Sequence, residues 1–521
     1  MNRLQPTPAI LTLLPALALI PLLAVVLGSL HGGGMSLISS FVEAAFHPSL
    51  EIQVLQSAWR GLQITILTAL LSWVISSFAG IGLGLASSTV FWSTFGAPSW
   101  VAVLIRRLLA VPRAIHELIW GLLLLQVLGL SVWVAILAIV IPYTALVARV
   151  VADQIDSQPR KTLTALCQLG APPISALASA FAAPMAPVLI SYGGYRLECA
   201  LRGATLLGVF GLGGLGTDLQ LTLQSLQFRE MWTGLWMLAA IMFGLERLLR
   251  WWRLRLKRRE MATTQLLQSF TLMLLIFSFS ICWLFLIDLD ARSGISWHHL
   301  PWPTLEALLN AFLELPWLTL IRETLTLTLL AAAVAIGMPP LGLLLMPNPI
   351  GISLQSGCWS ILRLIPTPLT ALLLLLITTP SIAVAAMALG LHNFGIMGRL
   401  LREGLDQQSE ETRIAFRTSG AGLRSAWLYG CLSPQSPSYL AYASYRTDVI
   451  LRETSVVGLV GGTGLGWQLL ESINAFNWAQ VLLVLIAFVT LTIFGESISD
   501  RCRNYWLGTK RFGPAALALQ S

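Results

Sequence analysis

Long apolar runs recur along the whole chain, and they constrain its fold more than any other feature. Examples are Ile10–Leu27, Leu266–Ile287 and Val481–Phe494. A helix needs about 20 mostly apolar residues to cross a bilayer. The chain is 56% hydrophobic and 11% charged, whereas soluble domains carry about 25% charged residues. These values exclude a soluble globular enzyme and a disordered chain, and they predict an all-α polytopic membrane protein.

The hydropathy pattern predicts about twelve membrane-spanning helices. The first apolar run is too long for a signal peptide and no convincing cleavage site follows it, so we expect it to be a retained helix. The expected ranges are 9–30, 61–86, 108–128, 131–150, 185–210, 231–249, 266–287, 323–346, 364–380, 381–398, 435–460 and 479–495.

The basic residues predict the orientation of these helices. The net charge is +8, and the densest basic run is Arg247–Arg259. Lys and Arg are enriched in cytoplasmic loops. We therefore expect both termini in the cytoplasm, a basic cytoplasmic linker at 250–265 and a cytoplasmic tail at 496–521. A patch that binds anionic lipid or a partner is the alternative interpretation of the linker.

The two halves of the chain are copies of each other. Arg113–Gly216 aligns without a gap to Arg363–Gly466 at an offset of 250 residues, and 17 of the 52 positions in 165–216 are identical in 415–466. Each half has six predicted spans, so both copies enter the membrane from the same side. The sequence predicts two parallel six-helix repeats, at 1–249 and 266–495, related by an axis along the membrane normal.

A polar segment interrupts each repeat between its fourth and fifth spans, at about 153–183 and 403–433. Both segments map to the cytoplasm. A glycine in each can turn the chain between two short helices, and such a protrusion can lie in a groove on a soluble partner. A plain amphipathic connector is the alternative. The shared residues are Ala165, Gly170 and Ala171 in the first copy and Ala415, Gly420 and Ala421 in the second.

These segments resemble the coupling (EAA) loop of ABC importer permeases, and the wider pattern resembles phosphonate ABC transporter permeases. Arg113-Ala-Ile-His-Glu117-Leu-Ile-Trp120 is similar to the family's R-x-I-P-E-L-I-W segment. Tyr195–Gly216 and Tyr445–Gly466 are similar to its Y-R-x-E…R…L-G-L-V-G-x-G-G-L-G segment. The resemblance covers about 100 contiguous residues of each half. The chain departs from the family in both loops, because Thr164-Ala165-Leu166 and Ile414-Ala415-Phe416 replace the expected Glu-Ala-Ala.

The resemblance implies a fused pair of permease subunits with the type I importer (MetI-like) fold, in a bacterial cytoplasmic membrane. It implies a pathway for phosphonate or a related oxyanion such as phosphite or phosphate. The expected partners are two cytoplasmic ABC ATPases, which use ATP and Mg, a periplasmic binding protein and membrane lipid, with no nucleic acid. The chain lacks a Walker A motif, so we expect no ATPase site, catalytic residue or bound cofactor. The alternatives are a fused permease for another substrate such as ferric iron, a twelve-helix secondary transporter, and an integral-membrane enzyme.

Charged residues within two predicted spans are the candidate pathway residues, because intramembrane charges are costly. The acid and the second arginine of each set lie at i,i+4, which favours a helical ion pair that clamps the structure. The alternative is that Arg196 and Arg446 face the pathway, where guanidinium groups match oxyanion geometry. The two sets are Tyr195, Arg196, Glu198 and Arg202, and Tyr445, Arg446, Asp448 and Arg452.

Two further patterns favour structural interpretations. Arg113 and Glu117 are expected to form an i,i+4 pair within the helix 108–128. Gly211–Gly216 superficially matches a dinucleotide fingerprint, but that motif needs a preceding strand, so we expect a glycine-rich turn or gate. The candidate gate glycines are Gly211, Gly214 and Gly216 in the first copy and Gly461, Gly464 and Gly466 in the second. No Cys/His spacing is typical of a metal site.

Overall fold

The computed structural model describes residues 7–31, 34–257, 263–287, 302–406, 408 and 411–507. This part of the chain is helical, with one isolated β-bridge between Leu30 and Thr378. It divides into two compact units. The first-repeat unit comprises the described residues of 44–300, and the second-repeat unit comprises those of 1–43 and 301–510.

The first-repeat unit is built around the paired helices α4 and α9. Cβ atoms added at Gly80 and Gly84 of α4 would lie 2.5 and 2.6 Å from Cβ of Val147 and Val151 on α9, so glycine permits the close approach. The elements are α4 (Ile52–Ala86), α5 (Thr89–Thr94), α6 (Trp100–Leu108), α7 (Ala110–Ala114), α8 (Glu117–Leu128), α9 (Val132–Ser157), α10 (Lys161–Gln168), α11 (Pro173–Leu207), the π-helix η2 (Gly208–Leu212), α12 (Leu215–Gln224), α13 (Phe228–Lys257) and α14 (Thr263–Ile287).

The second-repeat unit is built around the equivalent pair, α17 and α20. Here the small residue is on the second helix, because a Cβ added at Gly390 of α20 would lie 2.6 Å from Cβ of Val334 on α17. Helix α3 (Gly34–Phe46) crosses the boundary between the units in sequence. The elements are α1 (Thr7–Leu13), the 3₁₀ helix η1 (Leu14–Ala18), α2 (Leu19–Gly28), α16 (Leu305–Glu314), α17 (Trp317–Leu345), α18 (Pro349–Leu364), α19 (Thr367–Leu375), α20 (Ile382–Asp406), α21 (Glu411–Thr418), α22 (Leu423–Trp427), the π-helix η3 (Leu428–Leu432), α23 (Ser433–Gly461), α24 (Gly464–Asn474) and α25 (Trp478–Leu507).

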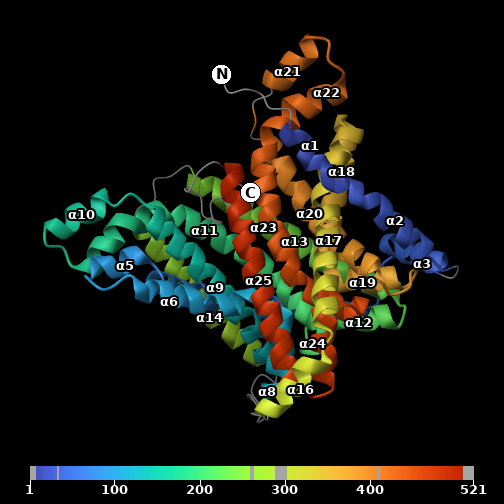
Figure 1. Ribbon diagram of the computed structural model, residues 1–521, viewed down its shortest axis with the longest axis horizontal. Helices are drawn as coiled ribbons and strands as arrows, with labels where there is room; N and C mark the ends of the chain where they lie inside the picture. The colour runs from blue at the N-terminus through green and yellow to red at the C-terminus, as the bar shows by residue number, and fades with distance from the viewer. Residues whose placement is uncertain are drawn as a thin grey trace. The chain divides into compact units, whose positions relative to one another are not determined.

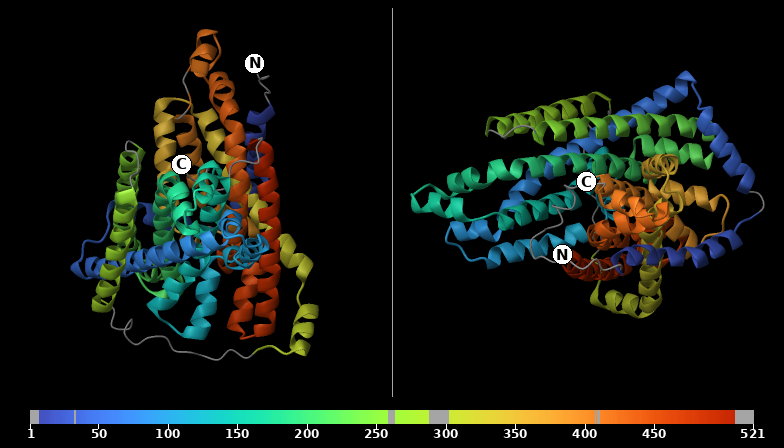
Figure 2. Two further views of the ribbon diagram at one scale, coloured as in Figure 1. Left: turned by 90° about the vertical axis from the view of Figure 1, so that its left-hand side faces the viewer. Right: turned by 90° about the horizontal axis from the view of Figure 1, so that it is seen from above.

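The first helix of each repeat packs in the unit of the other repeat. Helix α1 and η1 contact α17 and α23 (Figures 1 and 2), and His31 N donates to Ile377 O at 3.0 Å. Helix α14 packs on α4, where Leu284 joins a core cluster with Leu67 and Leu71. The compact units therefore do not coincide with the predicted segments 1–249 and 266–495.

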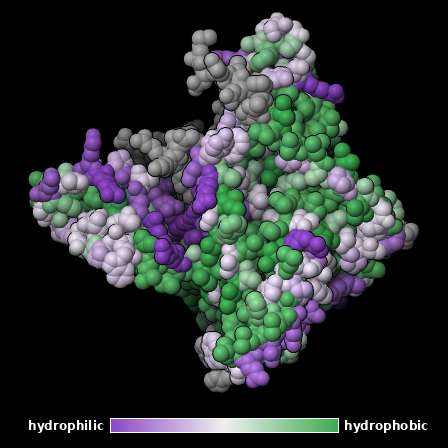
Figure 3. Space-filling view, viewed as in Figure 1, coloured by the Kyte–Doolittle hydropathy of each residue, from purple (hydrophilic) through white to green (hydrophobic). Residues whose placement is uncertain are grey.

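The described helices establish a multi-pass membrane protein. Seven are long and apolar enough to cross a membrane, and ten spans result if each of three bent helix pairs forms one. These ten fall on ten of the twelve predicted ranges. Helix α14 covers the eleventh range, and α23, which carries the motif charges, covers the twelfth, so twelve spans stay a prediction. Apolar residues cover much of the visible face along α1, α2 and α17 (Figure 3).

One predicted span in each repeat is sharply bent rather than straight. The bend is 85° between Trp100–Ala114 and Glu117–Leu128, and 96° between Pro349–Arg363 and Thr367–Leu375. The predicted span over 108–128 therefore consists of two helices joined at a bend. Arg113 and Glu117 lie on either side of its bend and do not share one helix.

Different residues produce the same bend in the two repeats. Ile365 is extended, with ψ of 122°, because a residue before proline avoids the helical region, and Pro366 is also extended, with ψ of 141°. In the first repeat Ile115 and His116 are extended, with ψ of 129° and 148°. His116 Nδ1 accepts a hydrogen bond from Leu118 N at 3.2 Å and so caps α8.

Two predicted boundaries move because helices continue past them. Helix α13 runs to Lys257, so much of the predicted linker 250–265 is helical, and 258–262 lies outside the described residues. Helix α25 runs to Leu507, so the predicted tail at 496–521 begins within a helix, and 508–521 lies outside the described residues.

Candidate functional site

A helix–turn–helix forms within each polar segment, as predicted. Gly170 and Gly420 have φ of +82° and +86°, a conformation that favours glycine. Ala171 N donates to Leu166 O at 3.1 Å, and Ala421 N donates to Phe416 O at 3.0 Å. The backbone geometry is therefore the same in both copies. In Figure 1, α10 projects at a tip of its unit, and α21 and α22 project beyond α20 and α23.

The two turns present different side chains. In the first, Leu169 is 84% exposed and Ile174 is 70% exposed. Ser419 and Arg424 occupy the equivalent positions in the second copy, and both are exposed. Arg417 is also exposed there. An apolar tip in the first repeat thus corresponds to a basic tip in the second.

The candidate gate glycines allow the backbone to pack tightly after the fifth span of each repeat. An added Cβ at Gly216 would collide with Thr205 O, and one at Gly466 would lie 2.8 Å from Ser455 Cα. Gly211, Gly214 and Gly464 have positive φ; Gly461 is the last residue of α23. These contacts give the motif a structural reason, and its role as a gate stays a prediction.

The same threonine staple holds this turn in each unit. Thr65 Oγ1 on α4 accepts from Leu215 N at 2.9 Å, and Thr324 Oγ1 on α17 accepts from Leu465 N at 3.0 Å. Each hydroxyl also donates to a carbonyl one turn earlier in its own helix. The staple therefore fixes the start of α12 and α24 on the central helix of the unit.

Arg196 lies in an aromatic box in the first-repeat unit. Its side chain is buried, and its Nε donates to Tyr192 Oη at 2.7 Å. Its Cζ lies 5.3, 5.0 and 5.5 Å from the ring centroids of Tyr143, Tyr192 and Tyr195. Cation–π attraction is strongest where the cation is desolvated, so the box stabilises a buried guanidinium.

Arg446 lies in a polar network in the second-repeat unit. Its Nε donates to Asn393 Oδ1, and its Nη2 lies 3.2 Å from Glu453 Oε1. Asn393 Nδ2 donates to Glu453 Oε2 at 2.8 Å, which closes a triangle between α20 and α23. Tyr442 and Tyr445 are retained, with ring centroids 5.8 Å apart.

The predicted i,i+4 ion pairs are present in both repeats. Arg202 Nη2 contacts Glu198 Oε1, and Arg452 Nη2 contacts Asp448 Oδ2. Arg452 Nη2 also lies 3.7 Å from Glu496 Oε2 on α25. The second pair thereby connects α23 to α25, which agrees with the clamp interpretation.

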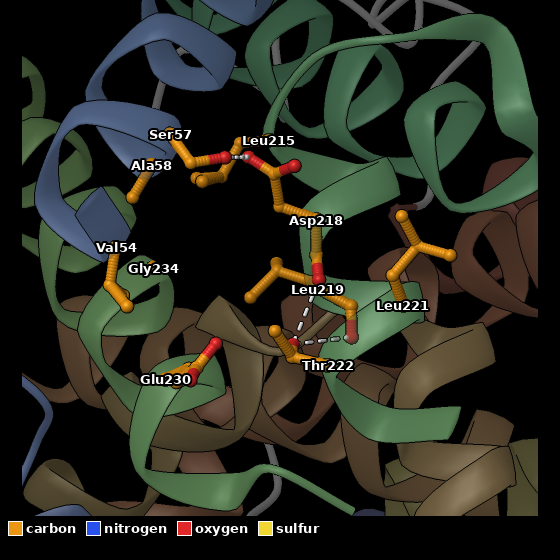
Figure 4. Close-up of a pocket in the computed structure, with 10 residues that line it drawn as sticks. All are labelled: Val54, Ser57, Ala58, Leu215, Asp218, Leu219, Leu221, Thr222, Glu230 and Gly234. Atoms are coloured by element: carbon orange, nitrogen blue, oxygen red, sulfur yellow. Dashed lines mark hydrogen bonds between the residues drawn. The ribbon is translucent and has the colours of Figure 1, made fainter. Parts of the chain in front are cut away.

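A small acidic pocket lies where α4, α12 and α13 meet in the first-repeat unit (Figure 4). Its volume is about 190 Å³, and Asp218 and Glu230 are among its lining residues. Ser57 Oγ donates to Asp218 Oδ2 at 3.4 Å. Burial raises the pKa of the Asp218 carboxyl above its usual value, and the hydrogen bond from Ser57 partly opposes that change. In the second repeat the neutral residues Gln468 and Gln480 replace the two acids.

The comparison with curated proteins yields a match that extends over most of the chain. A phosphate-import permease protein of Mycolicibacterium smegmatis is 22% identical over 462 residues, which cover 84% of this chain and 84% of that relative. A provisionally named phosphite transport system permease of Stutzerimonas stutzeri is 32% identical over 158 residues. This chain is related to the phosphonate-type ABC transporter permeases.

The other matches to this chain are partial. The match to the provisionally named phosphite permease spans 60% of that relative and 30% of this chain. A phosphite transport system permease protein of Stutzerimonas stutzeri is 28% identical over 54% of its length and 28% of this chain. No family model matches the chain. A crystal structure of an amino acid ABC transporter with histidines covers 39% of the chain at 19% identity with a TM-score of 0.33, and this weak likeness carries no conclusion.

Sequence reasoning missed four residues that surround the two motif arginines of the chain. They are Tyr143 and Tyr192 in the first repeat and Asn393 and Glu453 in the second. The signal for Glu453 and Asn393 was present, because both are polar residues within predicted spans. The tyrosines gave no comparable signal, since aromatic residues are ordinary in apolar helices.

Proposed function

We propose that this permease forms the translocation pathway of an ATP-driven ABC importer for phosphonate or a related phosphorus oxyanion, phosphite or phosphate. The match over 84% of both chains to a protein named for phosphate import carries the proposal. The partial matches to proteins named for phosphite transport support the same substrate class.

The proposed architecture is two parallel six-helix repeats of the MetI-like fold, fused in one chain in the bacterial cytoplasmic membrane with both termini inside. The repeated turns at Gly170 and Gly420 and the repeated threonine staples support the duplication. The cluster of basic residues at Arg247–Arg259 supports the orientation.

The proposed partners are two cytoplasmic ABC ATPases and a periplasmic binding protein. The exposed turns of α10–α11 and α21–α22 supply protrusions of the size that enters a groove on a soluble subunit. The ATPases would bind ATP and Mg, and this chain would contribute no catalytic residue or cofactor. The binding protein would deliver the substrate at the opposite face.

Arg196 and Arg446 are the proposed basic residues of the pathway. A guanidinium matches the oxygens of a phosphonate or phosphate group. A permease must also release the anion, so neither arginine should hold it tightly. The tyrosine box and the Asn393–Glu453 network both moderate the charge of the buried guanidinium.

Uptake by the complete importer in membrane vesicles tests the proposal. We expect ATP-dependent uptake of labelled methylphosphonate, phosphite or phosphate when the ATPases and the binding protein are present. Uptake of ferric iron alone would instead support another fused ABC permease. Uptake that persists without the ATPases and stops when the proton gradient collapses would support a secondary transporter and contradict the proposal.

A further inference from the structure

A half-buried carboxylate contacts the motif arginine of the second repeat from the same helix. Glu453 lies seven residues after Arg446 on α23, and its Oε1 is 3.2 Å from Arg446 Nη2. Its side chain is 16% exposed. Asn393 holds the other carboxylate oxygen at 2.8 Å. Removing the charge of one partner in such a pair leaves the other buried and uncompensated, which is costly.

The equivalent position in the first repeat has no side chain, but a different carboxylate lies beside it. Gly203 follows Arg196 by the same seven residues. An ideal Cβ on Gly203 would lie 3.2 Å from Glu117 Oε1 and 3.6 Å from Tyr143 Oη. Glu117 belongs to α8 and is 15% exposed, and its Oε2 lies 3.5 Å from His116 Nε2. Because His116 Nδ1 accepts from Leu118 N, a neutral His116 directs its Nε2–H toward Glu117.

Tyr143 lies beside both this carboxylate and the arginine of the first repeat. Its ring centroid lies 5.3 Å from Arg196 Cζ, and its hydroxyl borders the same Gly203 Cβ position as Glu117 Oε1. Asn393, which connects the acid and the arginine in the second repeat, occupies the position equivalent to Tyr143. In each repeat the residue at this position therefore lies near both the motif arginine and a carboxylate.

The two repeats also show a reciprocal exchange of residues. The first has Glu117 and Gly203, and the second has Thr367 and Glu453 at the equivalent positions. A side chain at Gly203 would occupy the space next to the Glu117 carboxylate. In the second repeat, Thr367 is smaller than the glutamate that it replaces, so it fills less of the equivalent space. One acid per site satisfies both the packing and the charge.

We propose that Glu117 and Glu453 are equivalent positioning residues that supply the counter-charge of the motif arginine, from α8 in the first repeat and from α23 in the second. This role rests on the proposed function. Each acid limits how strongly the arginine of its repeat binds a passing oxyanion. The acid thus acts through Arg196 or Arg446 and does not itself contact the substrate.

Exchange variants of the full importer test the equivalence. We expect Glu117→Thr and Gly203→Glu to lower uptake per folded complex about tenfold each, because the first removes the acid and the second adds a like charge beside it. The double variant E117T/G203E should return to within about threefold of the original rate. In the second repeat, Glu453→Gly should lower uptake and T367E/E453G should restore it.

The matched control is Glu306→Gln, which removes a carboxylate from an exposed position on α16. It should change neither the uptake rate nor the amount of folded complex. Folded complex is quantified by size-exclusion fluorescence before uptake is measured. Double variants that are no better than the worse single variant in both repeats would overturn the equivalence.

Retention of inorganic phosphate separates a counter-charge from a purely structural role. In the purified complex without binding protein, Glu117→Gln should bind labelled phosphate about tenfold more tightly, which corresponds to about 1.4 kcal/mol. A structural role would change the amount of folded complex but not its affinity, and unchanged affinity would overturn the counter-charge role. If the original complex neither binds nor transports any phosphorus oxyanion, the proposed function fails, while rescue of folded complex by the double variants still decides the equivalence.

Discussion

The first repeat surrounds its motif arginine with tyrosine rings, whereas the second binds the equivalent arginine with an amide and a carboxylate on adjacent helices. Arg196 and Arg446 occupy matching positions, yet Arg196 lies against three tyrosine rings whereas Arg446 contacts Asn393 and Glu453. Duplication thus preserved the cation and the backbone around it. The groups that stabilise the cation diverged, because several arrangements can satisfy one buried charge.

The same division between backbone and surface occurs at both ends of each repeat. The turns at Gly170 and Gly420 have the same geometry, but Leu169 and Ile174 correspond to Ser419 and Arg424. At the other end of the helices, the acids of the first-repeat pocket correspond to glutamines in the second. The two repeats therefore share their backbone geometry at these places but differ in the side chains that they present.

The largest expected effect tests whether the two arginine environments differ in energy. Arg446→Gln should lower the free energy of unfolding by about 3–5 kcal/mol, because it leaves the half-buried Glu453 without its counter-charge and breaks the network with Asn393. Arg196→Gln should cost less, about 1–2 kcal/mol through lost cation–π contacts, because Glu117 keeps its contact with His116. Denaturation in mixed detergent micelles measures both.

The double variant R446Q/E453Q provides the control for that prediction. It removes both charges of the buried pair, so it should recover most of the stability that Arg446→Gln loses. Equal losses for Arg196→Gln and Arg446→Gln would show that the two environments are energetically the same.

The second largest effect concerns the glycines that are alike in the two repeats. Gly216→Ala and Gly466→Ala should each lower the free energy of unfolding by about 1–3 kcal/mol, because the added Cβ meets backbone atoms that cannot move separately. Gly82→Ala on α4 is the matched control, since nothing lies within 4 Å of its added Cβ. A control variant as unstable as the other two would contradict this explanation.

A smaller effect sharpens the comparison between the two turns. Gly170→Trp blocks the apolar turn and leaves the basic one, so binding of the ATPases should weaken as salt rises. Gly420→Trp leaves the apolar turn, and binding should depend little on salt, because salt screens charged contacts. A pull-down of the ATPases between about 50 mM and about 500 mM salt measures the difference. Over this range the Debye length shortens about threefold. The same salt dependence for both variants would argue against unequal turns.

The smallest effect concerns the acidic pocket of the first repeat. Folding raises the pKa of Asp218, so its ionisation costs stability as pH rises from the unfolded pKa through the folded one. Asp218→Asn removes that cost and should raise Tm by about 1 °C at pH 7, a small change because the group is only partly buried. The gain should vanish below about pH 4, where the acid is protonated in both states. The matched variant Gln468→Glu in the second repeat should lower Tm at pH 7, and a gain that persists in acid would contradict the assignment.

Local sequence patterns predicted much of this architecture. The i,i+4 spacing of Glu198–Arg202 and Asp448–Arg452 predicted both ion pairs, because helix geometry alone brings such residues together. Gly170 and Gly420 predicted the turns for a similar reason. In each case the interacting atoms are within a few residues of one another in sequence.

The features that the sequence did not predict depend on distant contacts. The packing of α1 on α17 and α23 joins residues that are over 300 positions apart. The bend at His116 was missed because a histidine cap replaces the expected proline. The pairing of Glu453 with Arg446 depends on Asn393 from another helix. Such choices are decided by tertiary packing, which hydropathy and spacing do not encode.

The location of α1 and α2 in the second-repeat unit has a consequence for synthesis. This segment leaves the ribosome before its packing partners α17, α20 and α23, which begin at Trp317 and end at Gly461. At about 5–20 residues per second, those helices follow after roughly 15–90 s. During that interval the first helix must wait in the lipid or in the insertion machinery without its final neighbours. Folding of α1 and α2 therefore cannot be completed until the second repeat has been synthesised. A chain that stops between the repeats would leave these two helices without their packing partners.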